Sequence, residues 1–97
     1  MDTMTLPFEW DEEKAEENFK KHSVGFNEAK SVFGDPFSIT IDDPNHSGQE
    51  PRFIDIGYSK NGRILVVVYT ERGVKTRIIS CRKATLAERK KYEQQFL

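Results

Sequence analysis

The sequence predicts an α+β fold, in which an antiparallel β-sheet of four to five strands is combined with two N-terminal helices and one C-terminal helix. Three observations predict it. Segments with helical spacing of apolar residues come early, strand-like segments separated by turn signals follow, and a helix-capping pattern precedes the last segment. With 97 residues, the chain is long enough for one domain with a modest core. We therefore expect a single domain over residues 1–97.

The first third of the chain predicts a short strand and two helices. Residues 6–10 fit an edge strand. Asp11 fits the N-cap of a helix that ends at His22, and the thin apolar stripe of this helix places it on the surface. Asn27 fits the cap of a shorter second helix, which ends at Gly34 and the Asp-Pro pair that follows.

Four strands are expected next, over residues 37–41, 53–58, 64–69 and 74–82. Asn61-Gly62 separates the second from the third and predicts a type I′ turn, in which both central residues have positive φ. The third of these strands is apolar on both faces, so it should be central and covered on at least one side by helices. The last helix is expected from Leu86 to about Gln95, and we expect the helices to pack on one face of the sheet.

The joint between the last strand and the last helix carries several basic side chains. Thr85 and Glu88 have the spacing of a capping box, in which each side chain accepts a hydrogen bond from the other residue's amide. The joint therefore holds Arg77, Arg82 and Arg89 on regular elements, which suits phosphate binding. Strict alternation sends Arg77 and Arg82 to opposite faces of an ideal strand, so a bulge, the sheet edge or curvature must bring them together if they share a site.

Charge is distributed unevenly along the chain. Residues 1–50 contain 12 Asp and Glu against 4 Lys and Arg, whereas residues 51–97 contain 4 against 11. This asymmetry indicates either a face that binds a polyanion or an acidic segment that neutralises a basic one.

Several classes of protein are disfavoured by the sequence. The single cysteine, Cys81, excludes an intramolecular disulfide and a cysteine-based metal site. No apolar run approaches the roughly 18 residues of a membrane span, and no signal-peptide pattern is present. No phosphate loop or metal-ligand spacing is evident. We therefore expect a soluble cytoplasmic protein without a cofactor.

Basic and aromatic side chains of the second half predict a surface for single-stranded RNA. Guanidinium groups grip phosphate bidentately, and aromatic faces stack on unpaired bases. The candidates for RNA contacts are Arg52, Arg63, Tyr69 and Arg89. Arg89 can instead pair with Glu88 or Glu93 as a structural residue.

Two groups of residues resemble the BrnT toxins of bacterial type II toxin–antitoxin modules. In the first half these are Trp10-Asp11, Lys14, Asn18, Lys21-His22, Val24, Phe26, Glu28-Ala29, Val32-Phe33 and Asp35. In the second half they are Arg52, Gly57, Tyr69-Thr70, Arg77-Ile78-Ile79-Ser80, Arg82-Lys83-Ala84-Thr85, Glu88-Arg89 and Tyr92. The resemblance covers residues 8–92. Cys81 departs from the pattern, because a small alanine-like residue is more usual there.

The resemblance implies a RelE-like fold and metal-independent RNA cleavage that inhibits translation. It also implies neutralisation by a BrnA antitoxin with a ribbon-helix-helix domain, through which the pair represses its own operon. Basic residues of the sheet and last helix are implied to form the site, and we expect Trp10 and Asn18 to be structural.

The expected reaction is attack of an RNA 2′-hydroxyl on the adjacent phosphorus. The catalytic candidates are Arg77, Arg82, Lys21 and His22, with the arginines stabilising the transition-state charge. The residues that compete for proton transfer are Lys21, His22, Glu88 and Tyr69. The alternative function is a non-catalytic module whose basic face binds RNA or an acidic protein, or a structural subunit whose basic face is always occupied by its partner.

Overall fold

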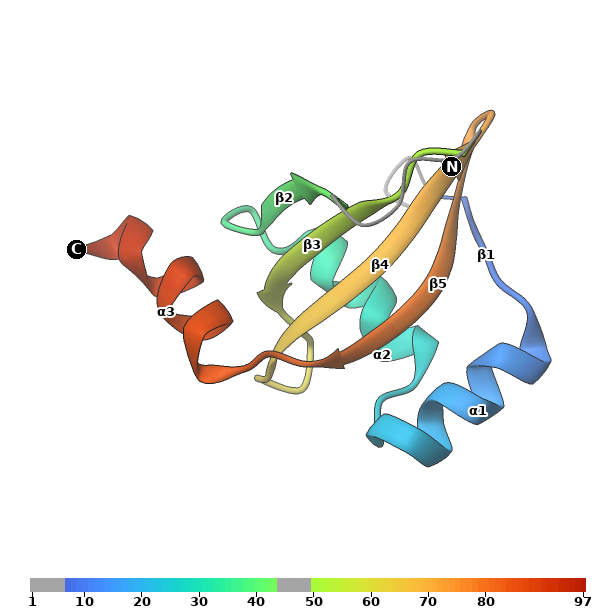
Figure 1. Ribbon diagram of the computed structural model, residues 1–97, viewed down its shortest axis with the longest axis horizontal. Helices are drawn as coiled ribbons and strands as arrows, with labels where there is room; N and C mark the ends of the chain where they lie inside the picture. Colours follow the sequence, from blue (N-terminus) through green and yellow to red (C-terminus); the bar gives the residue numbers. More distant parts are fainter. Residues whose placement is uncertain (1–6, 44–49) are drawn as a thin grey trace, which may run out of the picture.

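The computed structural model describes residues 7–43 and 50–97, and these form a five-stranded sheet with helices on both of its faces (Figure 1). In chain order the elements are β1 (Phe8–Glu9), α1 (Glu12–His22), α2 (Phe26–Ser31), the 3-10 helix η1 (Val32–Gly34), β2 (Ile39–Asp42), β3 (Phe53–Tyr58), β4 (Ile64–Arg72), β5 (Lys75–Lys83), α3 (Leu86–Glu93) and the 3-10 helix η2 (Gln94–Phe96). The predicted α+β class is confirmed. None of the helices in the described ranges is long and apolar enough to span a membrane.

The strand order is β1-β5-β4-β3-β2, with β4 in the centre as predicted. Neighbouring strands from β2 to β5 run antiparallel. β1 runs parallel to β5 and pairs Phe8 with Thr76 and Glu9 with Arg77, so the sheet is mixed and the purely antiparallel prediction is wrong at this edge. No tight turn connects β1 to β5, so the sequence carries no signal for the direction of this pairing.

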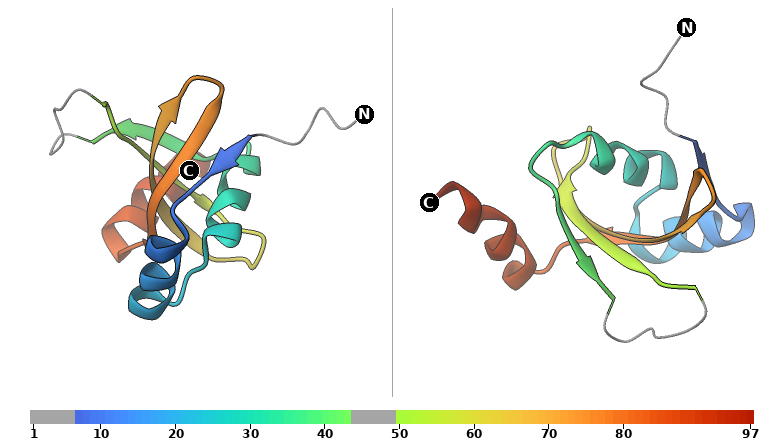
Figure 2. Two further views of the ribbon diagram at one scale, coloured as in Figure 1. Left: turned by 90° about the vertical axis from the view of Figure 1, so that its right-hand side faces the viewer. Right: turned by 90° about the horizontal axis from the view of Figure 1, so that it is seen from above.

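The two faces of the sheet are covered by different helices. On one side, here called the helix face, β4 and β5 pack against α2, η1 and the segment before α2 through Val24, Phe26, Ala29, Val32, Leu65, Val67, Ile78 and Cys81. Figure 2 shows α2 inside the curve of the sheet and α3 outside it. The opposite side is called the open face.

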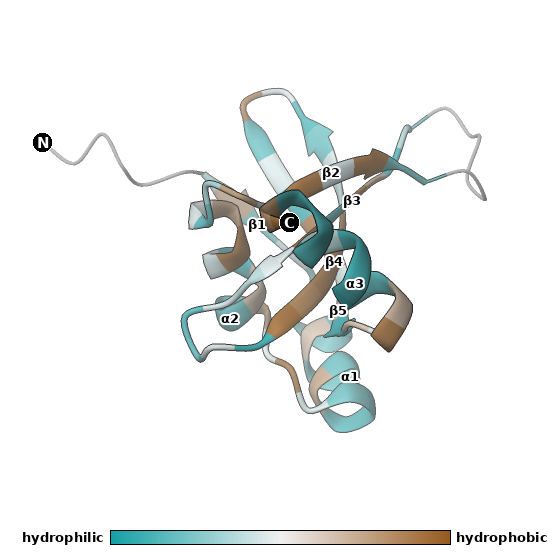
Figure 3. Cartoon of the chain, turned by 90° about the vertical axis from the view of Figure 1, so that its left-hand side faces the viewer, coloured by the Kyte–Doolittle hydropathy of each residue, from teal (hydrophilic) through white to brown (hydrophobic). Residues whose placement is uncertain are grey.

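At one end of the open face, Tyr92 of α3 packs against Ile56, Ile64 and Val66. The prediction that all helices lie on one face is therefore wrong for α3. The reason is that β4 is apolar on both faces, and each face needs cover. Figure 3 shows hydrophobic colouring along β4 and β2, whereas α1 and α3 are mainly hydrophilic.

Two predicted helix caps are confirmed. The Asp11 carboxylate accepts hydrogen bonds from the amides of Glu13 at 2.8 Å and Lys14 at 3.2 Å, and α1 begins directly after it. At the start of α3, the amide of Thr85 donates to Glu88 at 2.8 Å and the amide of Glu88 donates to the Thr85 hydroxyl at 3.2 Å. This capping box fixes the direction in which α3 leaves the sheet.

The predicted start of the second helix is wrong. α2 begins at Phe26 with Gly25 in the cap position, and Asn27 lies inside the helix. No side chain caps this end. The burial of Phe26 in the core sets the start of α2, and this is a tertiary contact that a capping pattern does not report.

The predicted type I′ turn between β3 and β4 is also wrong. Among the described non-glycine residues only Ser23 has positive φ, so Asn61 does not meet the requirement of that turn. The amide of Gly62, whose φ is 77°, donates to the Ser59 carbonyl at 3.0 Å, and the Ser59 amide donates to the Arg63 carbonyl at 2.8 Å. The connection is therefore a three-residue loop that ends in a left-handed glycine.

Candidate functional site

A β-bulge in β5 sets the direction of its basic side chains. Val68 pairs with Ser80, but the next residue of β4, Tyr69, pairs with Ile78. Ile79 is therefore an extra residue on β5 with no partner on β4. A bulge of this kind shifts the alternation of side chains along the strand by one position.

The shifted alternation places the two arginines of β5 on one side. Ile78 and Cys81 are three residues apart, yet both are buried in the core on the helix face. Their neighbours Arg77 and Arg82 consequently both project from the open face. The bulge thus supplies the geometry that the sequence left undecided.

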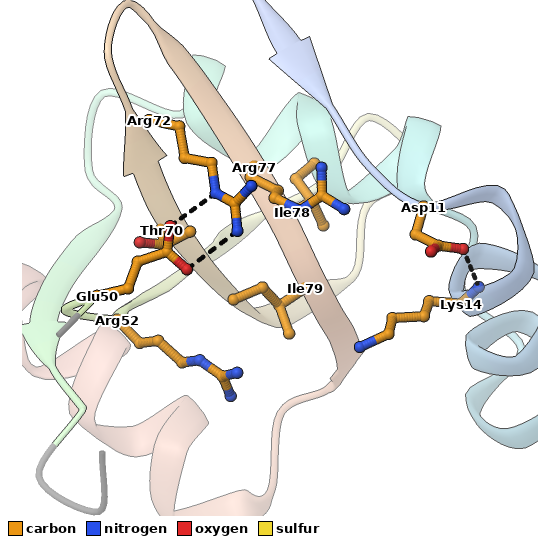
Figure 4. A pocket seen from close by; sticks show the side chains of 9 residues that line it. All are labelled: Asp11, Lys14, Glu50, Arg52, Thr70, Arg72, Arg77, Ile78 and Ile79. Carbon is orange, nitrogen blue, oxygen red and sulfur yellow. Dashed lines mark hydrogen bonds and ion pairs between the residues drawn. The ribbon is translucent and has the colours of Figure 1, made fainter. Parts of the chain in front are cut away.

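A hollow of about 160 Å³ lies on the open face between β5, the start of β3 and α1 (Figure 4). This arginine hollow is lined by Asp11, Lys14, Glu50, Arg52, Thr70, Arg72, Arg77, Ile78 and Ile79. Four of these side chains are cationic and two are carboxylates, so the hollow has a positive balance. It includes two predicted site residues, Arg52 and Arg77.

The three arginines of this hollow differ in their ion-pair partners. Arg72 donates to the carboxylate of Glu50 from Nε at 2.6 Å and from Nη2 at 3.2 Å, and this hydrogen bonding lowers the pKa of Glu50. Arg77 lies 3.3 Å from Glu9. Arg52 forms no ion pair within the described part of the chain. Partly exposed pairs of this kind are worth only about 0–1 kcal/mol, so an incoming phosphate can replace either carboxylate.

A second hollow continues from the first along α1. It is lined by Lys14, Glu17, Asn18, Lys21, His22, Ile79 and Ser80, and it shares Lys14 and Ile79 with the arginine hollow. The two together are called the basic groove. The predicted catalytic residues Lys21 and His22 therefore lie on the same groove as Arg77, although they come from opposite ends of the chain.

Asn18 fixes α1 beside β5. Its Nδ2 donates to the carbonyls of Cys81 at 2.8 Å and Val24 at 2.9 Å, and its Oδ1 accepts from the Cys81 amide at 3.1 Å. The side chain thus takes the place of a neighbouring strand at the part of β5 that β1 does not reach. The expected structural role of Asn18 is confirmed, and it positions Lys14 and Lys21 along the groove.

Arg82 is engaged with α3. Its Nη1 and Nη2 donate to the two carboxylate oxygens of Glu88 at 2.8 and 2.9 Å, and this contact is the main reason that the pKa of Glu88 falls to about 2. Glu88 is therefore a weak base. Arg82 is not among the residues that line the basic groove.

Arg63 lies on the helix side of the molecule. Its guanidinium makes two contacts with the buried carboxylate of Glu28 and a third with the Ser23 carbonyl at 3.2 Å. These contacts tie the β3–β4 loop to α2 and lower the pKa of Glu28 to about 2. The structure therefore separates Arg63 from the basic groove.

Tyr69 is a core residue with 7% of its surface exposed. Its ring contacts Phe33 and Phe53, with centroids 4.9 and 5.7 Å away, and its hydroxyl donates to Asp55 at 3.0 Å. Burial raises the pKa of Tyr69. The structure therefore contradicts the placement of this ring on an RNA-binding surface. The prediction failed because β4 is apolar on both faces, so its sequence does not indicate which residues face the helices.

Arg89 lines another hollow, at the end of the sheet. Tyr58, Gly62, Arg63, Ile64, Lys83, Ala84 and Arg89 form this terminal hollow. The alternative pairing of Arg89 with Glu88 or Glu93 is not observed in the described ranges. The predicted stretch from Arg77 to Arg89 is thus divided between two regions.

The charged groove residues that were not predicted as site residues include Lys14, Glu50 and Arg72. Lys14 lies seven residues before Lys21, and this helical spacing is a signal that could have identified it. Glu50 and Arg72 meet only in the folded chain, so no local pattern indicates their pairing.

Comparison with known proteins assigns the chain to a protein family. A family profile described as "Ribonuclease toxin, BrnT, of type II toxin-antitoxin system" matches residues 10–88. The chain belongs to the BrnT toxin family. Membership in this family makes the chain the toxin of a type II system, with RNA as its substrate and an antitoxin as its partner.

The BrnT assignment agrees with the fold. The 1.1 Å-resolution crystal structure of the Brucella abortus ribonuclease toxin, BrnT, superposes with a TM-score of 0.64 at 23% sequence identity. The match covers 84% of this chain and 99% of that chain. A comparison with curated proteins found no match.

Proposed function

We propose that this BrnT-family toxin is a metal-independent endoribonuclease whose reaction takes place in the basic groove. The observation that carries the proposal is the meeting of β5 and α1 at Ile79, which places Arg77 beside the hollow that contains Lys21 and His22. A fixed arrangement of cations around one surface is suited to a reaction that accumulates charge on phosphate.

In the proposed reaction the 2′-oxygen of a ribose bonds to the adjacent phosphorus, and the bond from phosphorus to the 5′-oxygen breaks. The products are a 2′,3′-cyclic phosphate and a 5′-hydroxyl. Arg52 and Arg77 bind the phosphate and stabilise its pentacoordinate dianion. His22 and Lys21 are proposed to accept the 2′-hydroxyl proton and to protonate the leaving oxygen, because both line the groove.

Arg82 acts less directly in this proposal. Because Glu88 occupies both terminal nitrogens of its guanidinium, Arg82 positions α3 at the end of the open face. Its charge is balanced by that of Glu88, so its expected contribution is structural.

The partner is proposed to be a BrnA-like antitoxin with a ribbon-helix-helix domain, and operator DNA is contacted only through it. RNA cleavage in the cytoplasm then stops translation until the antitoxin binds. The family assignment supports a toxin–antitoxin pair. A neighbouring reading frame with a ribbon-helix-helix pattern, whose product forms a complex with this chain and stops cleavage, is the expected finding.

The activity is tested with purified protein and single-stranded RNA in excess chelator. We expect cleavage that leaves a cyclic phosphate, and a single 2′-deoxy substitution at the cleaved nucleotide should stop it. Cleavage that requires an added metal ion, or RNA binding without cleavage in every preparation, contradicts the proposal. The second result favours a non-catalytic binding module.

A further inference from the structure

Figure 1 shows the β3–β4 loop close to the joint between β5 and α3. Residues of this loop and this joint line the terminal hollow. Its volume is about 270 Å³, and none of its lining residues is acidic. Arg77, Arg52 and the helix α1 line other surfaces, so this hollow is not part of the basic groove.

An exposed aromatic ring forms one wall of the hollow. Tyr58 ends β3 and has 45% of its surface exposed. Its ring is held edge to face against Tyr92, with centroids 5.6 Å apart and an interplanar angle of 76°. Tyr92 is itself buried, and its hydroxyl donates to Asp35 at 2.6 Å. The Tyr58 ring is therefore supported from beneath while remaining accessible.

Two cations beside this ring have no counter-charge among the described residues. The charge of Arg63 is neutralised by Glu28. Lys83 and Arg89, in contrast, form no ion pair with any residue in the described ranges. The amide of Arg89 donates to the Thr85 carbonyl at 2.9 Å, so the capped first turn of α3 fixes where its side chain leaves the helix.

An accessible ring next to unpaired cations fits a nucleotide. Aromatic rings stack on unpaired bases with little sequence preference, and Arg and Lys bind the attached phosphate. We propose that the terminal hollow is a second RNA-binding subsite, in which Tyr58 stacks on a base and Arg89 and Lys83 bind its phosphate. The inference rests on the proposed function, because it concerns the RNA whose scissile phosphate lies in the basic groove.

The terminal hollow and the arginine hollow are far enough apart to distinguish short from long RNA. Ile64 lines the terminal hollow and Thr70 lines the arginine hollow, and both belong to β4. Six residues of a strand span roughly 20 Å. At the stacked spacing of about 3.4 Å per nucleotide, roughly six nucleotides of RNA cover this distance. Fewer nucleotides cover it if the RNA is extended. A dinucleotide can therefore occupy the arginine hollow or the terminal hollow, but not both.

The test measures binding of uncleavable 2′-O-methyl RNA to the full chain, using a dinucleotide and an oligonucleotide of about ten nucleotides. Arg89→Gln and Tyr58→Leu are expected to weaken binding of the longer RNA about tenfold, with dinucleotide binding in the basic groove unchanged by NMR titration. Tyr58→Phe keeps the ring and should bind as the wild type does. Thermal unfolding of each variant separates lost binding from lost folding.

Lys90→Gln is the matched control, because it removes the same charge from the same helix outside the hollow. It should weaken binding less than twofold. An equal effect of Lys90→Gln and Arg89→Gln overturns the subsite, since general charge would then explain the result. Unchanged RNA binding in the Arg89 and Tyr58 variants also overturns the subsite proposal. This holds even if these variants lose binding to the antitoxin.

The outcomes remain separate from those for the proposed function. If the wild type binds the longer RNA through Arg89 but never cleaves RNA, the subsite stands and the endoribonuclease proposal fails. If the wild type cleaves RNA and both hollow variants bind the longer RNA normally, the endoribonuclease proposal stands and the subsite is wrong.

Discussion

Arg77 and Arg82 project from the same face of β5, although strict alternation sends residues five positions apart to opposite faces. The unpaired residue Ile79 causes this, because it shifts the alternation by one position. Each arginine has its own glutamate, Glu9 for Arg77 and Glu88 for Arg82. The shared face therefore does not give them the same role, and the following predictions separate the two.

Replacing Arg77 with Gln should lower the cleavage rate by about 10²–10³, because a charge that stabilises the transition state is lost. The circular dichroism spectrum should not change. Lys75→Gln removes an equal charge two residues away on the same strand and is the control. Similar losses in the two variants would show that net charge matters rather than the position of Arg77.

Arg82→Gln should reduce stability by about 1 kcal/mol, because its hydrogen bonds with Glu88 at the start of α3 are lost. Urea unfolding of Arg82→Gln, Glu88→Gln and the double variant measures the coupling between the two residues. The double variant should lose less than the sum of the single losses. A large loss of cleavage in Arg82→Gln without any loss of stability would instead place this side chain in the reaction.

Glu50→Gln should strengthen RNA binding several-fold, because the guanidinium of Arg72 is then free to bind a phosphate. One further phosphate contact should also steepen the salt dependence of binding to single strands by about 0.7 in the log–log slope. Filter binding at several salt concentrations measures both effects. Weaker binding in this variant would mean that Glu50 assists the substrate rather than competing with it.

Asn18→Ala should lower the free energy of unfolding by about 2–4 kcal/mol, because the buried backbone groups of Cys81 lose their partner. Asn27→Ala is the control. Asn27 is exposed and does not cap α2, so its loss should cost less than about 0.5 kcal/mol. A large loss of unfolding free energy in Asn27→Ala would indicate that Asn27 does cap α2, contrary to the structure.

Stability should fall as the pH drops from about 4.5 toward 2. The pKa of Glu28, lowered to about 2 mainly by its hydrogen bonds from Arg63, is below the ordinary value of 4.5, so the folded chain favours the ionised form. The stability gained is fully present above 4.5 and is lost on protonation, up to about 3 kcal/mol. Burial raises the pKa of Asp55, which has the opposite effect and disfavours the folded state as the pH rises above 3.8.

This acid sensitivity is checked by urea unfolding at several pH values. Glu28→Gln should be less stable than the wild type at pH 7 and should lose less stability between pH 4.5 and 2. Glu16→Gln, on the exposed side of α1, is the control and should follow the wild type. Parallel pH curves for the wild type and Glu28→Gln would contradict the account of this ion pair.

Local chemistry made part of the structure predictable. The caps at Asp11 and Thr85 depend on residues within four positions, and both were found where predicted. The central place of β4 followed from its apolar residues on both faces. The prediction of a type I′ turn was wrong because a left-handed glycine at position 62 also fits a longer loop. The Asn-Gly pair does not distinguish the two-residue turn from the longer loop.

The candidate site was less predictable because its geometry is tertiary. The bulge at Ile79 depends on how β5 pairs with β4, and no residue of β5 indicates it from the sequence alone. Arg63 meets Glu28 across 35 positions in the chain, and this contact removes it from the groove. Tyr69 lies in a strand that is apolar on both faces, so its burial could not be inferred from alternation.

The most direct test of the account compares RNA cleavage in excess chelator by three proteins: the wild type, the double variant Arg52→Gln/Arg77→Gln, and the double variant Lys90→Gln/Lys91→Gln. The two double variants lose the same charge, and only the first changes the basic groove. We expect cleavage by the wild type and by the lysine variant, and none by the folded arginine variant. Undiminished cleavage by the arginine variant, or none by the wild type, would contradict it.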